Sequence, residues 1–279
     1  MRALLFPGQG VQRTGMGAEL FADHSVLCDD ASNALGYDLV SVCLDSSGTQ
    51  LRRTEYAQPA IVFVNALAHL EARGAGRDSD YYAGHSLGEF NALVAAGAID
   101  LISCLKLVSL RGKAMSCIED GGMLAVFGLT REAVSEVLGE CGFAAVYIAN
   151  HNSDEQIVLA GERTMLKQCA RLLPTAGATK AVPLNVSGPF HSPLMAQAQR
   201  TFGRHLAEIE FGPLTKPVVS SVTGTSVEVS EIRRILRDQI SAPVEWVAAV
   251  RRLRQCGVTS FDEVNGSTLM RLSEHISAN

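Results

Sequence analysis

Three things are scarce in this sequence: surplus basic charge, long apolar runs and cysteines at paired spacing. Its 24 lysines and arginines are outnumbered by 29 aspartates and glutamates, for a net charge of −5. This balance excludes a broad basic surface for nucleic acid. No stretch reaches the roughly 18 apolar residues of a membrane-spanning helix, and the apolar run before Pro7-Gly8 is too short for a signal peptide. We therefore expect a soluble, cytoplasmic protein with neither a membrane nor a nucleic-acid partner.

The seven cysteines are scattered, with neither a CxxC pair nor a cluster of cysteine and histidine. They stand at Cys28, Cys43, Cys104, Cys117, Cys141, Cys169 and Cys256. An odd number without metal-ligand spacing argues against a disulfide framework and against a zinc site. We expect reduced thiols, mostly filling the core, and no bound metal.

The first 120 residues alternate strand and helix patterns. The apolar runs Arg2–Phe6 and Tyr81–Gly84 each lead into a glycine-rich turn, which is typical of buried strands. Helical patterns are expected at 17–27, 56–71 and 102–117, and also after Gly88. Pro59 is expected in the first turn of its helix, where a missing N–H is harmless. The alternation predicts an α/β fold with a parallel sheet covered by helices.

From Gly121 the pattern changes to β-α-β-β-α-β over about 65 residues, which is the ferredoxin-like order. Strands are expected at 123–128, 144–149, 156–160 and 179–184, and helices at 130–140 and 162–176, with Thr130 as an N-cap. Asn150, Asn152, Ser153 and Asp154 are expected in the turn between the central strands. Later helices are expected at 192–208, 231–239, 244–256 and the C-terminus, and strands at 217–221 and 259–264. We predict a body of residues 1–120 and 187–279 with an inserted subdomain of residues 121–186.

The sharpest local signal is Gly84-His85-Ser86-Leu87-Gly88, a G-x-S-x-G sequence between a predicted strand and a predicted helix. Flanking glycines allow the tight turn that exposes a serine hydroxyl, and the following helix N-terminus supplies free N–H groups. Ser86 is therefore the candidate nucleophile, and the backbone N–H of Leu87 is the natural oxyanion donor. The alternative is a glycine-rich turn that serves packing alone.

A serine nucleophile needs a base, and seven histidines compete for the role. His24, His69, His205 and His275 lie in helical or terminal stretches, and His85 is adjacent to the serine, where neighbouring side chains usually point apart. His191 sits in a loop shaped by Gly188 and Pro189, which can hold an imidazole rigidly. Spacing favours His191 but leaves His151 open as the alternative.

The chain as a whole resembles the malonyl-CoA:acyl-carrier-protein transacylases, which include fatty-acid synthase enzymes and trans-acting polyketide synthase acyltransferases. The resemblance covers nearly its full length. It rests on FPGQG at Phe6–Gly10, GHSLGE at Gly84–Glu89, LRGKAM at Leu110–Met115, the triplet Phe190–Ser192 and QISAPVEW at Gln239–Trp246. It implies an α/β-hydrolase-like body with a parallel sheet and an inserted ferredoxin-like subdomain.

The resemblance also implies roles for single residues. Ser86 would form an acyl-serine ester, His191 would be its base, and the main-chain carbonyl of Gln239 would orient the imidazole. The backbone N–H groups of Gln9 and Leu87 would form the oxyanion hole. Further members of the implied site are Arg111, which would bind the malonyl carboxylate, and Phe190, Met115 and His85, which would line the acyl pocket.

The implied activity is malonyl transfer from malonyl-CoA to the phosphopantetheine thiol of an acyl carrier protein. No cofactor is implied, since malonyl-CoA is a substrate and the partner carries the phosphopantetheine. We expect a monomer. Basic residues that could dock an acidic carrier are Arg52, Arg53, Arg163, Lys167, Arg171 and Lys180. The alternatives are an acyl hydrolase with the same serine and histidine, and a carrier-docking module without catalysis.

Two departures from the family pattern concern fine acyl specificity. Asn265-Gly266-Ser267 replaces the usual Gly-Pro-Gly, and Gly188-Pro189 is not the commonest pair before Phe190. The resemblance places both near the acyl or pantetheine channel. Asn150 and Asn152 match a polar stretch that lines the cleft in this family, although turn formation explains them equally well.

Overall fold

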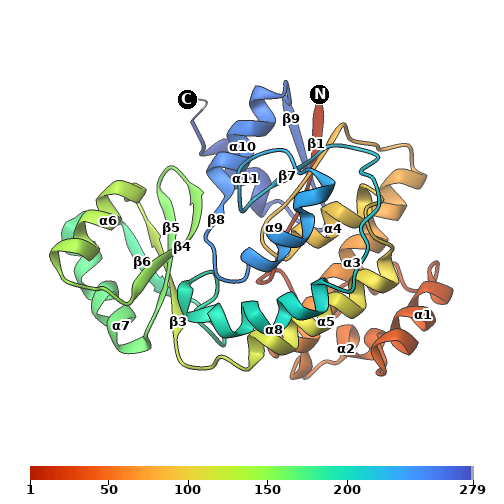
Figure 1. The fold of residues 1–279 in the computed structure, drawn as a ribbon, viewed down its shortest axis with the longest axis horizontal. Helices are drawn as coiled ribbons and strands as arrows, with labels where there is room; N and C mark the ends of the chain where they lie inside the picture. The colour runs from red at the N-terminus through yellow and green to blue at the C-terminus, as the bar shows by residue number, and fades with distance from the viewer. Residues whose placement is uncertain (278–279) are drawn as a thin grey trace.

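The structure, a computed structural model, describes residues 1–277 and contains two sheets (Figure 1). The first has the strand order β7-β2-β1-β9, and the second has the order β6-β3-β5-β4-β8. The strands are β1 (Arg2–Phe6), β2 (Tyr81–Gly84), β3 (Gly122–Phe127), β4 (Val146–Ser153), β5 (Gln156–Gly161), β6 (Lys180–Pro183), β7 (Val218–Ser220), β8 (Val244–Glu245) and β9 (Ser260–Glu263).

Helices cover both faces of the first sheet and one face of the second. They are α1 (Ser25–Leu35), α2 (Leu39–Leu44), α3 (Thr54–Gly74), α4 (Gly88–Ala95), α5 (Leu101–Ser116), α6 (Arg131–Glu140), α7 (Arg163–Leu172), α8 (Ala196–Leu206), α9 (Ile232–Asp238), α10 (Trp246–Gln255) and α11 (Thr268–Glu274). Short 3₁₀ turns lie at Gln50–Arg52, Leu173–Ala176, Pro193–Met195 and Val229–Glu231. Among the described residues, no helix has both the length and the apolar character needed to cross a membrane.

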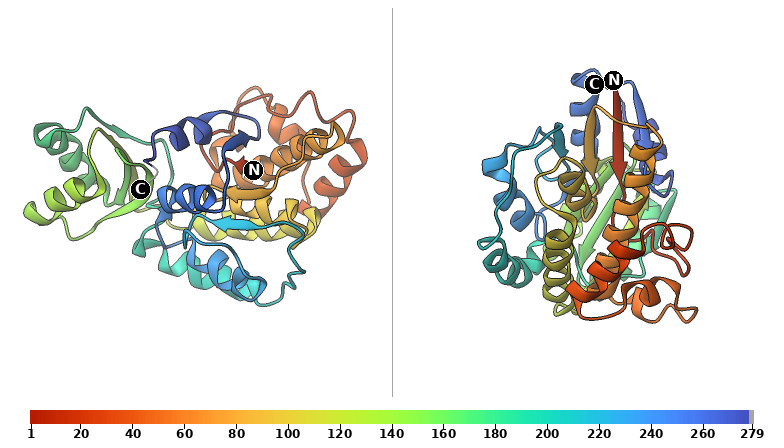
Figure 2. Two further views of the ribbon diagram at one scale, coloured as in Figure 1. Left: turned by 90° about the horizontal axis from the view of Figure 1, so that it is seen from above. Right: turned by 90° about the vertical axis from the view of Figure 1, so that its right-hand side faces the viewer.

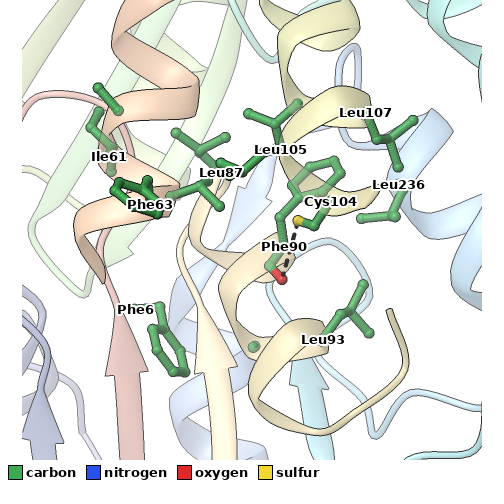
Figure 3. Packing of buried hydrophobic residues seen from close by; sticks show 14 of the residues in the cluster. Phe6, Ile61, Phe63, Leu87, Phe90, Leu93, Cys104, Leu105, Leu107 and Leu236 are labelled. Carbon is green, nitrogen blue, oxygen red and sulfur yellow. Dashed lines mark hydrogen bonds between the residues drawn. The ribbon is translucent and has the colours of Figure 1, made fainter. Parts of the chain in front are cut away.

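The first sheet is parallel throughout and buried on both faces. Alternate residues of β1 point to opposite sides, so that Leu4 and Phe6 join one apolar cluster and Ala3 and Leu5 another. The first cluster packs against α3, α4 and α5 (Figure 3), and the second against α10 and α11. Because both faces are covered, β1, β2 and β7 are nearly continuous apolar runs, whereas the edge strand β9 is polar and partly exposed.

The second sheet lies to one side of the first, with α6 and α7 covering one of its faces (Figures 1 and 2). Strands β3, β4, β5 and β6 pair antiparallel in the order expected for a ferredoxin-like β-α-β-β-α-β unit. Strand β8, which comes from a much later part of the chain, adds to its edge parallel to β4. The predicted fold class, a parallel α/β body with a ferredoxin-like subdomain, is confirmed.

Two predicted helix positions near the N-terminus are wrong. Residues 14–24 form turns, and α1 starts only at Ser25. Gly15 and Gly17 both have positive φ, and a Cβ on Gly17 would lie 2.7 Å from Val64, so the chain turns where the periodicity predicted a helix. Pro59 is the sixth residue of α3, not part of its first turn, because the helix already begins at Thr54.

The predicted polar turn is also misplaced. Asn150, Asn152 and Ser153 belong to β4, which extends to Ser153 and leaves only a short turn before β5. Two register shifts interrupt the pairing of β4 with β5, and such bulges re-aim side chains. As a result Asn150 and Asn152 are both buried. Likewise Val244–Glu245, predicted to open a helix, pair with β4, and α10 starts at Trp246.

Candidate active site

Ser86 lies in a tight turn between β2 and α4, with a left-handed backbone at φ 51°. The turn brings chains very close together. A Cβ on Gly84 would lie 2.0 Å from the backbone of Gly88, and one on Gly88 would lie 1.9 Å from the carbonyl of Phe6. Only glycine fits at both positions, and this forces the serine into its strained conformation.

His191 contacts the serine from a distant part of the chain. Its Nε2 lies 2.7 Å from Ser86 Oγ, and its Nδ1 lies 2.8 Å from the main-chain carbonyl of Gln239. Because a carbonyl can only accept, Nδ1 carries the proton and Nε2 is free to accept from the serine hydroxyl. His191 also has a positive φ, 60°. Burial, together with the nearby Arg111 charge, lowers the pKa of His191 to about 3, which keeps the imidazole neutral.

Arg111 on α5 brings its side chain to the same point. Its side chain is only 1% exposed, and one Nη lies 2.9 Å from Gln239 Oε1 and 3.5 Å from Ser86 Oγ. Its Nε–H has no acceptor among the described residues. Burial lowers the pKa of Arg111 to about 10, and the Glu89 charge acts in the opposite direction, so the guanidinium stays charged. A buried cation with an unused donor is suited to bind an anionic group.

The predicted oxyanion donors come from two adjacent turns. The Pro7-Gly8-Gln9 turn runs against the serine turn, since a Cβ on Gly8 would lie 2.5 Å from the carbonyl of His85 and 3.4 Å from the amide of Leu87. Within residues 1–277, neither the N–H of Gln9 nor that of Leu87 donates to a backbone carbonyl. Both amides are therefore free to bind an oxyanion.

These groups open into a cavity of ≈ 180 Å³. Its lining includes all of the predicted pocket residues, Phe190, Met115 and His85, together with Gln9, Leu87 and Arg111. The opposite side comes from the second sheet, through Met123, Asn150, Asn152 and Val158. Asn152 Oδ1 lies 2.8 Å from His85 Nε2, which joins the two sides. Both asparagines therefore line the cleft.

The remaining sequence candidates lie elsewhere. His151 Nδ1 lies 3.8 Å from a carboxylate oxygen of Glu245, and His151 does not line the cleft. Asn265 bonds to α3 through the Val64 carbonyl and Asn65 and does not line the cleft. Of the basic docking candidates, Arg53 pairs with Glu55.

Three other basic candidates lie on α7, a helix that covers the second sheet. Arg163, Lys167 and Arg171 recur at every fourth residue along the exposed side of α7. Residues four apart lie on the same face of a helix, so these side chains form a row.

Sequence reasoning missed two groups, the Gln239 side chain and Glu89. The Gln239 amide donates to the carbonyl of Ser86 at 2.9 Å and to Glu89, and it accepts from Arg111. Glu89, in the first turn of α4, is 2% exposed. The signal for Glu89 was its charge at the start of a helix that is otherwise apolar except for Asn91. No local signal marked the Gln239 side chain, because its partners lie 128 to 153 residues away.

Comparison with known proteins supports one family over the full chain. Residues 3–272 match the family model described as acyl transferase domain. The chain is 40% identical to the polyketide biosynthesis malonyl CoA-acyl carrier protein transacylase PksC of Bacillus subtilis, covering 99% of this chain and 97% of that protein. It is 43% identical to the polyketide biosynthesis protein ThaF of Burkholderia thailandensis over 97% of this chain.

The chain spans only 24% and 36% of the length of two longer curated relatives, the first of which is ThaF. Among solved structures, it superposes with a TM-score of 0.93 on a malonyl-transacylase in complex with its type II polyketide acyl-carrier protein. That pair is 34% identical and covers 99% of this chain and 92% of the other. By its sequence, its fold and the arrangement around Ser86, the chain belongs to the acyl transferase domain family.

Proposed function

We propose that the protein transfers a malonyl group from malonyl-CoA, through an ester on Ser86, to the phosphopantetheine thiol of an acyl carrier protein. The observation that carries the proposal is the position of a buried guanidinium beside a serine–histidine pair, with Arg111 Nη 3.5 Å from Ser86 Oγ. A thioester whose acyl group ends in a carboxylate satisfies both features at once. The names of the relatives, which include malonyl CoA-acyl carrier protein transacylases, support this substrate class.

The first half-reaction follows from the site geometry. The malonyl carboxylate binds Arg111, and this places the thioester carbonyl beside Ser86. His191 Nε2 takes the serine proton as Oγ attacks the carbonyl carbon, and the resulting oxyanion is bound by the amides of Gln9 and Leu87. The C–S bond then breaks, His191 returns the proton to the leaving thiolate, and free coenzyme A departs from the malonyl-serine ester.

The second half-reaction runs the same steps in reverse order. The carrier's phosphopantetheine thiol gives its proton to His191 and attacks the ester carbonyl. Ser86 leaves, recovers the proton, and the malonyl thioester departs on the carrier. The neutral carbonyl of Gln239 orients His191, so the pair acts as a dyad without a carboxylate. We propose that the protein works in the cytoplasm as a monomer without a cofactor, and that the row on α7 contributes to carrier docking.

The test follows labelled malonyl-CoA in the presence of a holo carrier protein. We expect label on Ser86 by intact mass, then on the carrier. Label released as free malonate would indicate the hydrolase alternative, and absence of turnover would indicate a docking module. A malonyl adduct on the Ser86→Ala variant would contradict the assignment of the nucleophile.

A further inference from the structure

A buried carboxylate lies behind the serine turn, and the reaction steps above do not use it. Glu89 Oε1 accepts from Ser220 Oγ and from the amide of Ser221, both at 2.6 Å, and its Oε2 accepts from Gln239 Nε2. It forms no ion pair among residues 1–277 in spite of being 2% exposed. Burial raises the pKa of Glu89, and these donors act against that effect.

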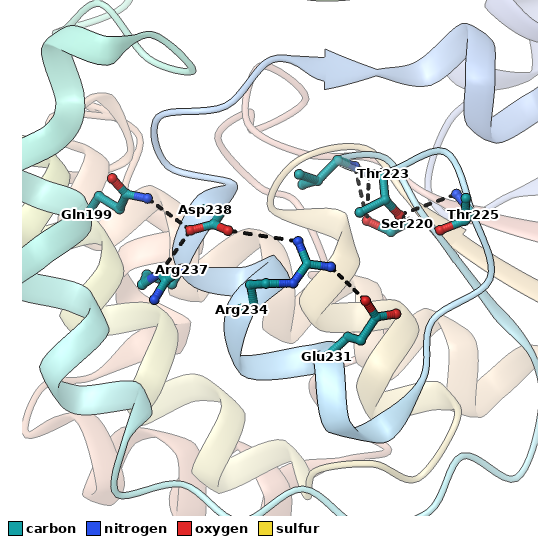
Figure 4. Close-up of polar contacts among 9 residues, drawn as sticks. Gln199, Ser220, Thr223, Thr225, Glu231, Arg234, Arg237 and Asp238 are labelled. Carbon is teal, nitrogen blue, oxygen red and sulfur yellow. Dashed lines mark hydrogen bonds and ion pairs between the residues drawn. The ribbon is translucent and has the colours of Figure 1, made fainter.

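Every partner of this carboxylate is fixed as a donor. The Ser221 amide can only donate. The Ser220 hydroxyl already accepts from the amide of Thr223 at 3.4 Å (Figure 4) and from that of Val222 at 3.0 Å, so its own proton points to Glu89. No acceptor remains for a carboxyl proton in this arrangement. Glu89 is therefore placed as an acceptor on both oxygens.

The Gln239 amide has one orientation that satisfies all of its neighbours. Its NH₂ group faces two acceptors, Glu89 and the Ser86 carbonyl, and its oxygen faces the Arg111 guanidinium. Turning the amide over would set the NH₂ group against Arg111, donor against donor. The main chain at this point is also held, because Asp238, at the end of α9, is bound by Gln199 and Arg237 (Figure 4).

We infer that Glu89 is a positioning residue for malonyl selectivity: it holds the Gln239 amide in the orientation that keeps the Arg111 guanidinium beside Ser86. The inference rests on the proposed function and deepens it. Glu89 touches neither substrate nor the reacting atoms and acts through Gln239. The selectivity for a carboxylated acyl group then depends on two residues, 89 and 239, that lie outside the lining of the cavity.

The substitution Glu89→Gln tests this link with little change in volume. An amide at position 89 must place an NH₂ group where a carboxylate oxygen now accepts, either against the Ser221 amide or against Gln239 Nε2. The second arrangement is relieved when the Gln239 amide turns over, which removes the acceptor of Arg111. The readout is the ratio of kcat/KM for malonyl-CoA to that for acetyl-CoA, because any effect on Ser86 common to both substrates cancels.

We expect Glu89→Gln to lower this ratio about tenfold, the fold-change given by one lost hydrogen bond to a charged group. In an Arg111→Ala background the same substitution should leave the ratio unchanged, because the link is already broken. The matched control is Glu263→Gln, a half-buried carboxylate outside the cleft, which should leave the ratio at the wild-type value. An unchanged ratio in Glu89→Gln, or an equal fall in both backgrounds, would overturn the inference.

A second variant covers the case in which Glu89→Gln does not fold. Gln239→Met keeps the main-chain carbonyl that orients His191 and removes the amide, so the ratio should again fall about tenfold. An unchanged ratio in this variant would also overturn the inference. If the wild type forms no acyl-serine from either thioester, the proposed function fails instead. Calorimetric titration with malonate can then still test whether Glu89 acts on Arg111 through Gln239. We expect malonate to bind Glu89→Gln about tenfold more weakly than wild type.

Discussion

The two sides of the cleft are held in different ways. On the side of the first sheet, Ser86, His191, Arg111 and Gln239 are each less than a tenth exposed and are joined by hydrogen bonds. The second sheet contributes mainly side-chain surface, and within the cleft it reaches the first side through the bond from Asn152 to His85. The comparison teaches that the reacting groups all lie on one side of the cleft, whereas both sides line the room for the acyl group.

The second sheet is attached through the pairing of β4 with β8, through apolar residues such as Ala149 and Val158 that join the first apolar cluster, and through ion pairs. Arg131 on α6 binds both carboxylate oxygens of Glu245, and Arg251 on α10 binds Asp154 at 3.1 Å. Partly exposed ion pairs of this kind contribute little to stability compared with a buried network. Substitutions should therefore have large chemical effects on the first side and small geometric effects on the second.

The largest effect is expected from His191→Ala. In the proposed mechanism the imidazole, 2.7 Å from Ser86 Oγ, accepts the serine proton, and removal of a general base typically lowers kcat by about 10²–10⁴-fold. Steady-state transfer to the carrier measures this loss. The control is His151→Ala, which should retain most of the activity because His151 faces Glu245 outside the cleft. Comparable losses in the two variants would contradict the assignment of the base.

Arg111→Ala should lower kcat/KM for malonyl-CoA far more than kcat/KM for acetyl-CoA. It removes the cation proposed to bind the malonyl carboxylate. Loss of one partner of a buried pair costs on the order of 3–5 kcal/mol, or about 10²–10⁴-fold in kcat/KM. Use of acetyl-CoA should not fall with it. Competition between the two thioesters measures the preference directly. A parallel loss on both substrates would mean that Arg111 supports the turn and does not bind the carboxylate.

The pH profile tests the coupling between the two residues. Since the pKa of His191 is lowered to about 3 from its usual value of 6.5, the base stays neutral and the acid limb of kcat/KM should lie well below pH 6.5. Arg111→Ala removes a positive charge that lowers this pKa, so the limb should move upward. A limb already at pH 6.5 in the wild type would rule out a buried base.

The same shift has a consequence for stability. As the pH falls from 6.5 toward 3, the unfolded chain binds a proton at this histidine that the folded chain does not, so the folded state loses stability across that window. Thermal melts at stepped pH would show this loss.

The smallest effect is expected when the ion pair between Arg131 and Glu245 is broken. Arg131→Met should lower the free energy of unfolding by about 1 kcal/mol, as for other partly exposed pairs. It should raise KM severalfold while kcat is kept, because the second side shifts and the reacting groups do not. Chemical denaturation with kinetics measures both. Arg53→Met, which removes an exposed pair with Glu55, serves as control and should change neither the free energy of unfolding nor KM. If Arg131→Met lowered kcat as much as His191→Ala does, the proposed difference between the two sides would be wrong.

Features of the fold and the site that neighbouring residues determine could be predicted from the sequence, whereas features that depend on distant contacts could not. Glycines around Ser86 and the alternation of apolar runs are local, and they predicted the serine turn and the parallel sheet. Spacing favoured His191 as the partner of Ser86 but left His151 open, and the contact of His191 with Ser86 joins residues 105 positions apart. The bulges that bury Asn150 and Asn152 depend on pairing with β5, which no pattern within β4 reveals.

The hydrogen bonds of the Gln239 side chain were the hardest feature to predict. Its main-chain role was implied by the resemblance. Its side chain finds hydrogen-bond partners only in the folded chain, where α4, α5 and the serine turn meet around it. Glu89 belongs to the same class, since a glutamate early in a helix is ordinarily a solvated first-turn residue. Tertiary contact, not helix preference, sets its environment.

The left-handed backbone shared by Ser86 and His191 makes the enzyme fragile in a particular way. Each such residue costs about 1–3 kcal/mol and persists only while its surroundings hold it. Mild denaturant or warming that loosens either loop lets the chain relax to an ordinary conformation and separates the dyad. Inactivation should therefore precede the loss of circular dichroism, so an inactive preparation can still look folded.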